Sequence, residues 1–132
     1  MSREEMTLQL KAQFVPALRR LGFKGTLPHF RRQRENRVDL LTVQFDRHGG
    51  GFVVEIASCG VEGFTTHWGK FIPAATLTAH DLHPSQRHRL GSPGPDTDNW
   101  FRFDQGVSPT VVAERACARL DEAERWWNTQ TT

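Results

Sequence analysis

The sequence predicts an α+β domain in which a single antiparallel β-sheet, a meander of about four to five strands, packs against an N-terminal and a C-terminal helix. Apolar residues recur at helical spacing near both ends, whereas the middle consists of short apolar or alternating stretches bounded by turn residues. The chain has 132 residues, 37% hydrophobic and 24% charged, which is typical of one globular unit. We therefore expect a single domain over residues 1–132, with frayed ends at residues 1–3 and 128–132.

The first helix is predicted over residues 4–21. Ser2 and Glu5 have the spacing of a capping box, and Gly22 is suited to end the helix. One apolar stripe follows at helical spacing, formed by Leu10, Phe14, Leu18 and Leu21. Pro16 lacks an amide donor and crowds the preceding turn, so we expect the helix to kink or break there.

The second helix is predicted over residues 109–127. Ser108 is a favourable N-cap, and Pro109 occupies the first helical position, where its missing amide does no harm. The apolar face expected for this helix consists of Val112, Ala116, Leu120, Ala123 and Trp127.

The strands are predicted in the middle of the chain. They are expected at residues 29–33, 38–45 and 52–59, with further short strands at 67–72 and 99–103. Both faces of 38–45 are partly apolar, which indicates a central strand. The turn DRHGGG before residue 52 contains glycines, which adopt positive φ without strain. The proline-rich residues 73–99 are expected to form a long loop with one short helical turn near residues 74–79.

Several protein classes are excluded at this point. The N-terminus lacks the apolar region of a secretory signal, and no stretch approaches the length of a membrane span. Cys59 and Cys117 are isolated and have neither metal-binding nor redox spacing, so reduced thiols are expected rather than a disulfide. These features predict a cytoplasmic protein that does not associate with membranes.

The region 19–37 is strongly basic, although the net charge of the whole chain is only +2. Its basic residues are Arg19, Arg20, Lys24, Arg31, Arg32, Arg34 and Arg37. With Phe30 between them, they could hold nucleic-acid phosphates while the ring stacks on a base, or they could meet an acidic protein partner. The preferred interpretation is that they form the solvated face of a hairpin, because the net charge is low and no nucleic-acid motif is present.

The sequence contains fragments of known catalytic motifs but no complete one. HGGG at residues 48–51 resembles the oxyanion loop of lipases, yet the nucleophile motif G-x-S-x-G is missing, so a hairpin turn is expected. His80, His83 and His88 could contribute to a metal site, although exposed loop histidines are the preferred interpretation. Nothing near Cys59 predicts an activated thiol. We therefore predict no catalytic residue, no metal ligand and no cofactor.

The motifs LGFKG, HFRR, VQF, FVVEI, RHRLG and NWF occur in this order over nearly the whole chain. In this order they resemble a bacterial group, domain-of-unknown-function family four-three-zero-four. The recurring positions of that family fall on Arg32, Gln44, Arg89 with Gly91, and the aromatic pair Trp100 and Phe101. The chain departs from the family at Phe45 and Asp46, where lysine and serine are usual, and at Phe101, where tryptophan is commoner. The resemblance implies a fold and a set of positions but no reaction.

The candidate binding residues are Arg32, Gln44, Arg89, Trp100 and Trp126. A glutamine on a central strand needs hydrogen-bond partners, so the first four could form a buried polar network or line a polar pocket. Trp126 adjoins Trp127 on the helix, so it is expected either to cover another element at the margin of the core or to anchor a partner.

The absence of a catalytic constellation favours a non-enzymatic binding or interaction protein, such as an immunity-type or accessory protein that masks a protein partner. Two alternatives remain open at this point. One is a nucleic-acid-associated module that uses the basic residues of 19–37, and the other is a small-ligand-binding or enzymatic domain around Gln44, Arg89 and Trp100.

Overall fold

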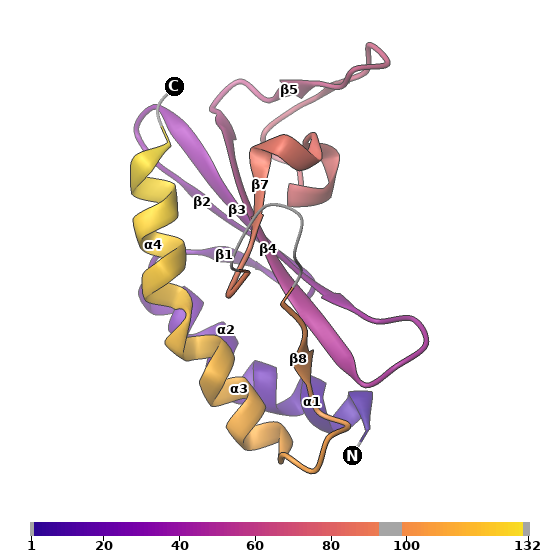
Figure 1. The fold of residues 1–132 in the computed structure, drawn as a ribbon. Coiled ribbons are helices and arrows are strands. Elements are labelled where there is room, and N and C mark those ends of the chain that lie inside the picture. The colour runs from indigo at the N-terminus through magenta and orange to yellow at the C-terminus, as the bar shows by residue number, and fades with distance from the viewer. Residues whose placement is uncertain (1, 93–98, 131–132) are drawn as a thin grey trace.

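The computed structural model describes residues 2–92 and 99–130 and has the predicted α+β architecture. An antiparallel sheet carries all of the long helices on one face, and the two terminal segments lie side by side there (Figure 1). We call this the helix face. The opposite face is covered by residues 73–86, and we call it the loop face. None of the helices in the described ranges is long and apolar enough to cross a membrane.

The N-terminal helix comprises α1 (Arg3–Gln9), a π-helical turn (Leu10–Phe14) and α2 (Val15–Arg20). The helix does not break at Pro16, as one of the two expected outcomes would require, but its hydrogen-bond pattern changes in the turn just before the proline. The amide of Val15 bonds to the carbonyl of Leu10, five residues back, so the wider turn accommodates the proline that follows. Ser2 and Glu5 form the predicted capping box.

Both ends of this helix are therefore well defined. Ser2 caps the first turn and Arg3 is the first residue of α1, whereas Met1 lies outside the described residues. The fraying expected at residues 1–3 stays a prediction. At the other end Gly22 adopts a φ of 95°, and its amide bonds to the carbonyl of Arg19. The Phe23 amide bonds to the carbonyl of Leu18, which completes a Schellman motif at the predicted position.

The main sheet has the order β1-β2-β3-β4-β7, and β8 pairs with the same edge of β4 as β7. Its strands are β1 (Lys24–Thr26), β2 (His29–Gln33), β3 (Arg37–Phe45), β4 (Gly51–Gly60), β7 (Arg87–Arg89) and β8 (Phe101–Arg102). The long β3 lies in the centre, as its two apolar faces predict, and all pairings are antiparallel.

Two expectations for the region after β4 are wrong. The strand expected at residues 67–72 does not join the sheet, because β5 (Phe64–Thr65) and β6 (Phe71–Ile72) pair only with each other. The long loop expected at 73–99 contains β7 and two short 3₁₀ turns, Ala79–Asp81 and Pro84–Gln86, while residues 93–98 lie outside the described part. The outer edge of β4 has unpaired backbone groups, and pairing with them makes a strand of β7.

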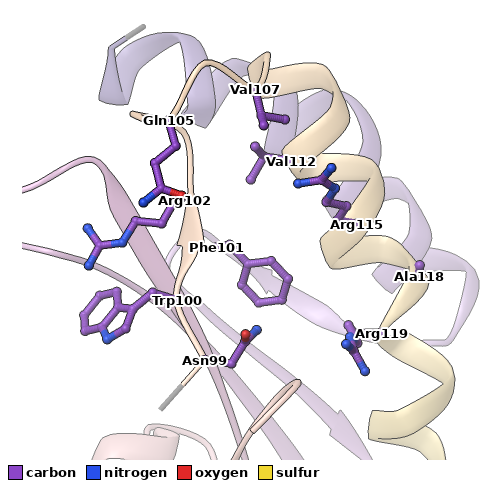
Figure 2. Close-up of a pocket in the computed structure, with 10 residues that line it drawn as sticks. All are labelled: Asn99, Trp100, Phe101, Arg102, Gln105, Val107, Val112, Arg115, Ala118 and Arg119. Atoms are coloured by element: carbon purple, nitrogen blue, oxygen red, sulfur yellow. The ribbon is translucent and has the colours of Figure 1, made fainter.

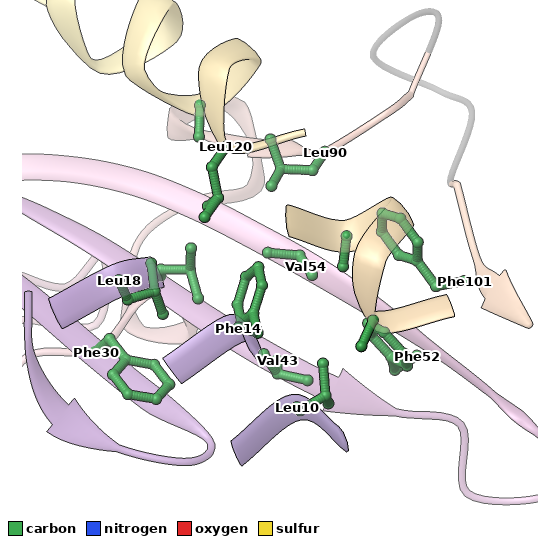
Figure 3. Close-up of a cluster of buried hydrophobic side chains, with 14 of the residues drawn as sticks. Leu10, Phe14, Leu18, Phe30, Val43, Phe52, Val54, Leu90, Phe101 and Leu120 are labelled. Carbon is green, nitrogen blue, oxygen red and sulfur yellow. The ribbon is translucent and has the colours of Figure 1, made fainter. Parts of the chain in front are cut away.

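The hydrophobic core has one part on each face of the sheet. On the helix face, Phe14, Val43 and Val54 belong to a continuous cluster between both terminal helices and the sheet (Figure 3). On the loop face, a smaller cluster of buried residues lies beneath the segment 73–86, formed by Val38, Leu40, Ala57, Leu77, Ala79 and Leu82. This division explains why both faces of β3 are apolar.

The C-terminal segment consists of α3 (Pro109–Ala118) and α4 (Leu120–Thr129), separated at Arg119. Ser108 caps α3 through the amide of Val111, as predicted. All five residues of the predicted apolar face are buried. α4 continues to Thr129, two residues beyond the predicted end, and residues 131–132 lie outside the described part. The fraying expected at residues 128–132 stays a prediction.

Candidate functional site

Arg32 lies on the helix face in a polar network around Asp39. The Asp39 side chain is fully buried on β3, and its Oδ2 accepts hydrogen bonds from Arg32 Nη2 at 2.7 Å and Arg34 Nε at 2.6 Å. Arg32 also donates to Glu124 on α4 at 2.5 Å and to the carbonyl of Leu21 at 3.1 Å. Its guanidinium therefore connects β2, β3 and α4, which favours the network interpretation for this residue.

The basic residues of 19–37 do not gather on one surface. Arg19 donates to backbone carbonyls just after α2, whereas Arg31 faces the other side of the sheet and donates to the carbonyls of Ala74 and Leu77. Three more surround Asp39. Of the seven, Arg20 and Lys24 are the two that are exposed without such contacts. The nucleic-acid interpretation stays a prediction, but no continuous basic strip supports it.

Arg89 lies on the loop face beside a second buried carboxylate, Glu55 of β4. The Arg89 Nε atom is 2.5 Å from Glu55 Oε2, and Arg87 contacts the other carboxylate oxygen. Glu55 is only 2% exposed, so its charge is costly to bury without these two guanidinium groups. Arg87, Arg89 and Glu55 thus join β7 to β4 through side chains as well as through the backbone.

Gln44 is exposed near the end of β3 and lines a cavity of about 380 Å³. The other polar side chains in this cavity include His29, Thr42 and His80. Arg32 lies on the opposite face and Gln44 is not buried, so the structure does not unite the four predicted residues in a single network or pocket. Gln44 and Arg89 share the loop face.

The two histidines of this cavity lie close together. Their ring centroids are 6.0 Å apart with the rings nearly perpendicular, and His29 Nδ1 is 2.9 Å from Thr42 Oγ1. Burial lowers the pKa of His29, and the neighbouring His80 lowers it further. Burial also lowers the pKa of His80. Two neutral imidazoles can exchange hydrogen bonds with a polar ligand at neutral pH.

The three candidate metal-binding histidines, His80, His83 and His88, contact different groups. His83 Nδ1 is 2.8 Å from Ser85 Oγ, and His88 Nε2 is 2.8 Å from Glu122 Oε2 on α4. Among the described residues, no three histidine, cysteine, aspartate or glutamate side chains are arranged to hold a metal ion.

Trp100 lies beside a groove between β8 and α3 (Figure 2). Trp100 and Arg102 project from β8 away from α3, whereas Phe101 projects toward that helix. The Arg102 guanidinium lies over the Trp100 ring, 5.6 Å from its centroid. The groove has a volume of about 540 Å³, and it is also lined by Arg115 of α3 and by Arg119, which follows that helix.

Trp126 is half-buried at the margin of the core, where it covers another element. Its ring stacks on His88 of β7, with centroids 6.0 Å apart and the planes inclined by 16°. Glu122, one turn earlier on α4, receives hydrogen bonds from His88 at 2.8 Å and from the Gly91 amide at 3.0 Å. This contact secures β7 and the turn that follows it to α4.

The contact between α4 and β7 should depend on pH. Partial burial opposes ionisation of Glu122, but the hydrogen bonds from His88 and Gly91, together with the charge of Arg119, lower its pKa below the ordinary value of 4.5. A lowered pKa in the folded state stabilises the fold above the unfolded-state pKa, and this stabilisation is lost as the pH falls through the folded-state value. The stability difference between wild type and Glu122→Gln should therefore shrink below about pH 4.5.

Urea denaturation of both proteins between pH 7 and about pH 3 measures this effect. Glu114→Gln is the matched control, because Glu114 is exposed on α3. A difference between wild type and Glu122→Gln that stays constant over this pH range would contradict the assignment.

The hairpin formed by β5, β6 and the residues between them extends beyond the edge of the main sheet (Figure 1). Phe64 and Ile72 pack against the loop-face cluster and hold its base. Trp68 and Phe71 point outward, with 65% and 55% of their surface exposed. The turn is tightly bonded, since the Thr66 amide donates to the Lys70 carbonyl at 2.8 Å.

The remaining motifs have structural explanations. Gly49 and Gly50 of HGGG lie in the turn between β3 and β4, and Gly51 begins β4. None of these three glycines has the positive φ expected of them, but a Cβ on Gly50 would lie 2.4 Å from Asp104 Cβ. Cys59 and Cys117 are both free, so the sulfurs are unpaired as expected. Burial raises the pKa of Cys59 to about 11, which disfavours the reactive thiolate.

Sequence reasoning missed four residues that organise these regions. Asp39 and Glu55 stand as single charged residues within the apolar runs VDLLTV and FVVEIA, a signal that each would be buried with a cationic partner. Trp68 and Phe71 lie in a segment that was interpreted as a sheet strand, where one face would be covered. The short separation between β5 and β6 is the local signal for a separate hairpin, although it does not say whether these two rings are exposed.

Comparison with known proteins supports a single assignment. The family model described as Domain of unknown function (DUF4304) matches residues 14–130, nearly the whole chain. Searches of curated proteins and of solved structures found no match. The matched range includes the whole main sheet together with α2, α3 and α4, and it begins after α1. The chain therefore belongs to the domain-of-unknown-function family DUF4304.

Proposed function

We propose that this protein is a non-enzymatic binding protein of the bacterial cytoplasm that holds a protein partner through the hairpin β5–β6. An accessory or immunity-type protein that masks its partner fits this role. The observation that carries the proposal is the exposure of Trp68 and Phe71, 65% and 55%, on one short projecting element. Large aromatic side chains are enriched among the residues that dominate binding energy at interfaces.

The hairpin presents these rings in an ordered conformation. Thr66 is 4% exposed, its amide donates to the Lys70 carbonyl, and its hydroxyl accepts from the Lys70 amide at 3.0 Å. The His67 ring packs edge-on against Trp68, with centroids 4.8 Å apart. A loop that is already ordered loses less conformational entropy on binding. The geometry fits a partner with an apolar cleft into which the two rings insert.

A photo-crosslinking amino acid at position 68 tests the proposal in the host cell. The same amino acid at position 8 is the control, because Leu8 on α1 is also 65% exposed. We expect one specific protein to be cross-linked from position 68 and not from position 8. Cross-linking of that protein from position 8 alone would contradict the proposal.

The affinity of the purified partner provides the quantitative test. Trp68→Ser combined with Phe71→Ser should weaken binding by about 100-fold or more, since each ring is expected to contribute about 2 kcal/mol. Leu8→Ser should leave the affinity unchanged. Both variants should keep their stability within about 0.5 kcal/mol, because the replaced side chains are exposed. Equal losses in the two variants would show that the hairpin is not the docking element.

A further inference from the structure

The groove between β8 and α3 has an unbalanced charge. It is about 540 Å³ in volume, within the range of small-molecule sites. Its lining residues are Asn99, Trp100, Phe101, Arg102, Gln105, Val107, Val112, Arg115, Ala118 and Arg119. Among the described residues, the lining contains three arginines and no carboxylate, although the whole chain has nearly equal numbers of acidic and basic residues. A positive, partly enclosed groove attracts and holds anions.

The three arginines differ in how far nearby acids neutralise them. Arg102 lies 3.8 Å from Asp46 and 3.9 Å from Asp104, outside the groove. Arg119 makes one weak contact with Glu122, at 3.3 Å. Arg115 forms no hydrogen bond or ion pair within the described part of the chain. The uncompensated charge therefore lies on the α3 side of the groove.

Arg115 and Arg119 are four residues apart on adjacent turns, so both side chains leave the same face of the helical segment. Figure 2 shows Arg115 reaching from α3 toward β8 above Phe101. A guanidinium group can donate two hydrogen bonds to one anion, and a second positive charge on the same wall favours an anion with more than one negative charge. A phosphate monoester carries up to two negative charges near neutral pH, whereas a carboxylate carries one.

The groove also has apolar and amide groups around this pair. Val107 is half-buried and Ala118 exposed along its wall, and the side chains of Asn99 and Gln105 line it from the β8 side. An inorganic anion would leave the apolar part in contact with water. A molecule with an apolar body beside its phosphate would cover it.

We propose that this groove binds a small organic phosphate, with Arg115 and Arg119 supplying the positive charge that attracts the phosphate group and the apolar body lying against Val107. The side-chain amides of Asn99 and Gln105 supply orienting hydrogen bonds from the β8 side. The site is independent of the hairpin, which lies on another part of the molecule (Figure 1).

Calorimetric titration with phenyl phosphate, inorganic phosphate and phenol tests the site on the intact protein. Phenyl phosphate should bind about tenfold more tightly than inorganic phosphate, because the ring is removed from water, and phenol should not bind measurably. Arg115→Ala and Arg119→Ala should each weaken phenyl phosphate binding by about tenfold or more. Both residues are exposed, so the variants should fold normally.

Arg125→Ala is the matched control, because Arg125 is an exposed arginine on α4 outside the groove, and it should bind phenyl phosphate like wild type. The Trp68→Ser, Phe71→Ser protein should also bind normally, which separates this site from the proposed partner surface. Unchanged binding after loss of both Arg115 and Arg119, or an equal loss in Arg125→Ala, would overturn the proposal. Tighter binding of a single-stranded oligonucleotide through the same two arginines would replace it with nucleic-acid recognition.

Discussion

Asp39→Ala should lower the free energy of unfolding by about 3–5 kcal/mol, because it removes the anion from a buried ionic network. Asp39 has no exposed side-chain surface, and it accepts hydrogen bonds from Arg32 and Arg34, with Arg37 Nε 3.6 Å from its other oxygen. Glu124 would remain beside Arg32, but the other guanidinium groups would lose their nearest carboxylate. Urea denaturation at neutral pH measures the change.

Asp121→Ala is the control for this prediction. Asp121 is exposed on α4, so its removal should change the free energy of unfolding by less than about 0.5 kcal/mol. Asp39→Asn should be less damaging than Asp39→Ala, since the amide oxygen can still accept one hydrogen bond. A cost below about 1 kcal/mol for Asp39→Ala would show that the network is not an important source of stability.

Trp127→Ala should lower the free energy of unfolding by a similar amount, about 3–5 kcal/mol. Trp127 is fully buried, its ring packs 4.9 Å from that of Phe23, and its Nε1 donates to the Ala57 carbonyl at 3.0 Å. Alanine would leave a cavity between α4 and the sheet and would remove the hydrogen bond to β4. Thermal and urea unfolding of the variant measure the loss.

Two further variants separate the causes of this effect. Trp127→Phe keeps most of the apolar contact but removes the indole donor, so it should be less costly than Trp127→Ala. Trp126→Ala removes the half-buried neighbour, which stacks on His88, and should also be less costly. If Trp126→Ala were the more destabilising of the two alanine variants, the assignment of Trp127 as the core residue would be wrong.

The elements that could be predicted are those whose pattern is local. Leu10, Phe14 and Leu18 recur with the helical period, and all three are buried on the helix face. The strand 38–45 is apolar on both sides and lies in the centre of the sheet. A pattern of this kind depends only on neighbours within a few residues, so it can be recognised without knowing which element packs against it.

Elements that depend on distant partners could not be predicted in this way. β7 has the sequence RHR and no apolar period, and it is a strand because the open edge of β4 offers it backbone partners. Conversely, residues 67–72 have strand-like composition, yet β6 pairs only with β5. In both cases the decisive backbone groups belong to another segment.

The candidate binding residues show the same limit. The resemblance identified Arg32, Gln44, Arg89 and Trp100 as a set, but strand alternation sends Arg32 to the helix face and Gln44 and Arg89 to the loop face. Which face of the sheet is covered by helices depends on where the two terminal helices pack. The buried carboxylates that these arginines meet, Asp39 and Glu55, lie on opposite faces for the same reason.

The sequence alone predicted the two amphipathic helices and the two long antiparallel strands, because local periodicity encodes them. Its short motifs predicted the family. The tertiary structure decided which arginines form ion pairs with buried carboxylates and which remain able to bind an anion. It also decided that Trp68 and Phe71 face solvent, and that Arg115 and Arg119 border a groove beside Trp100. Exposure and charge balance depend on which distant segments cover a side chain, and no local pattern contains that information.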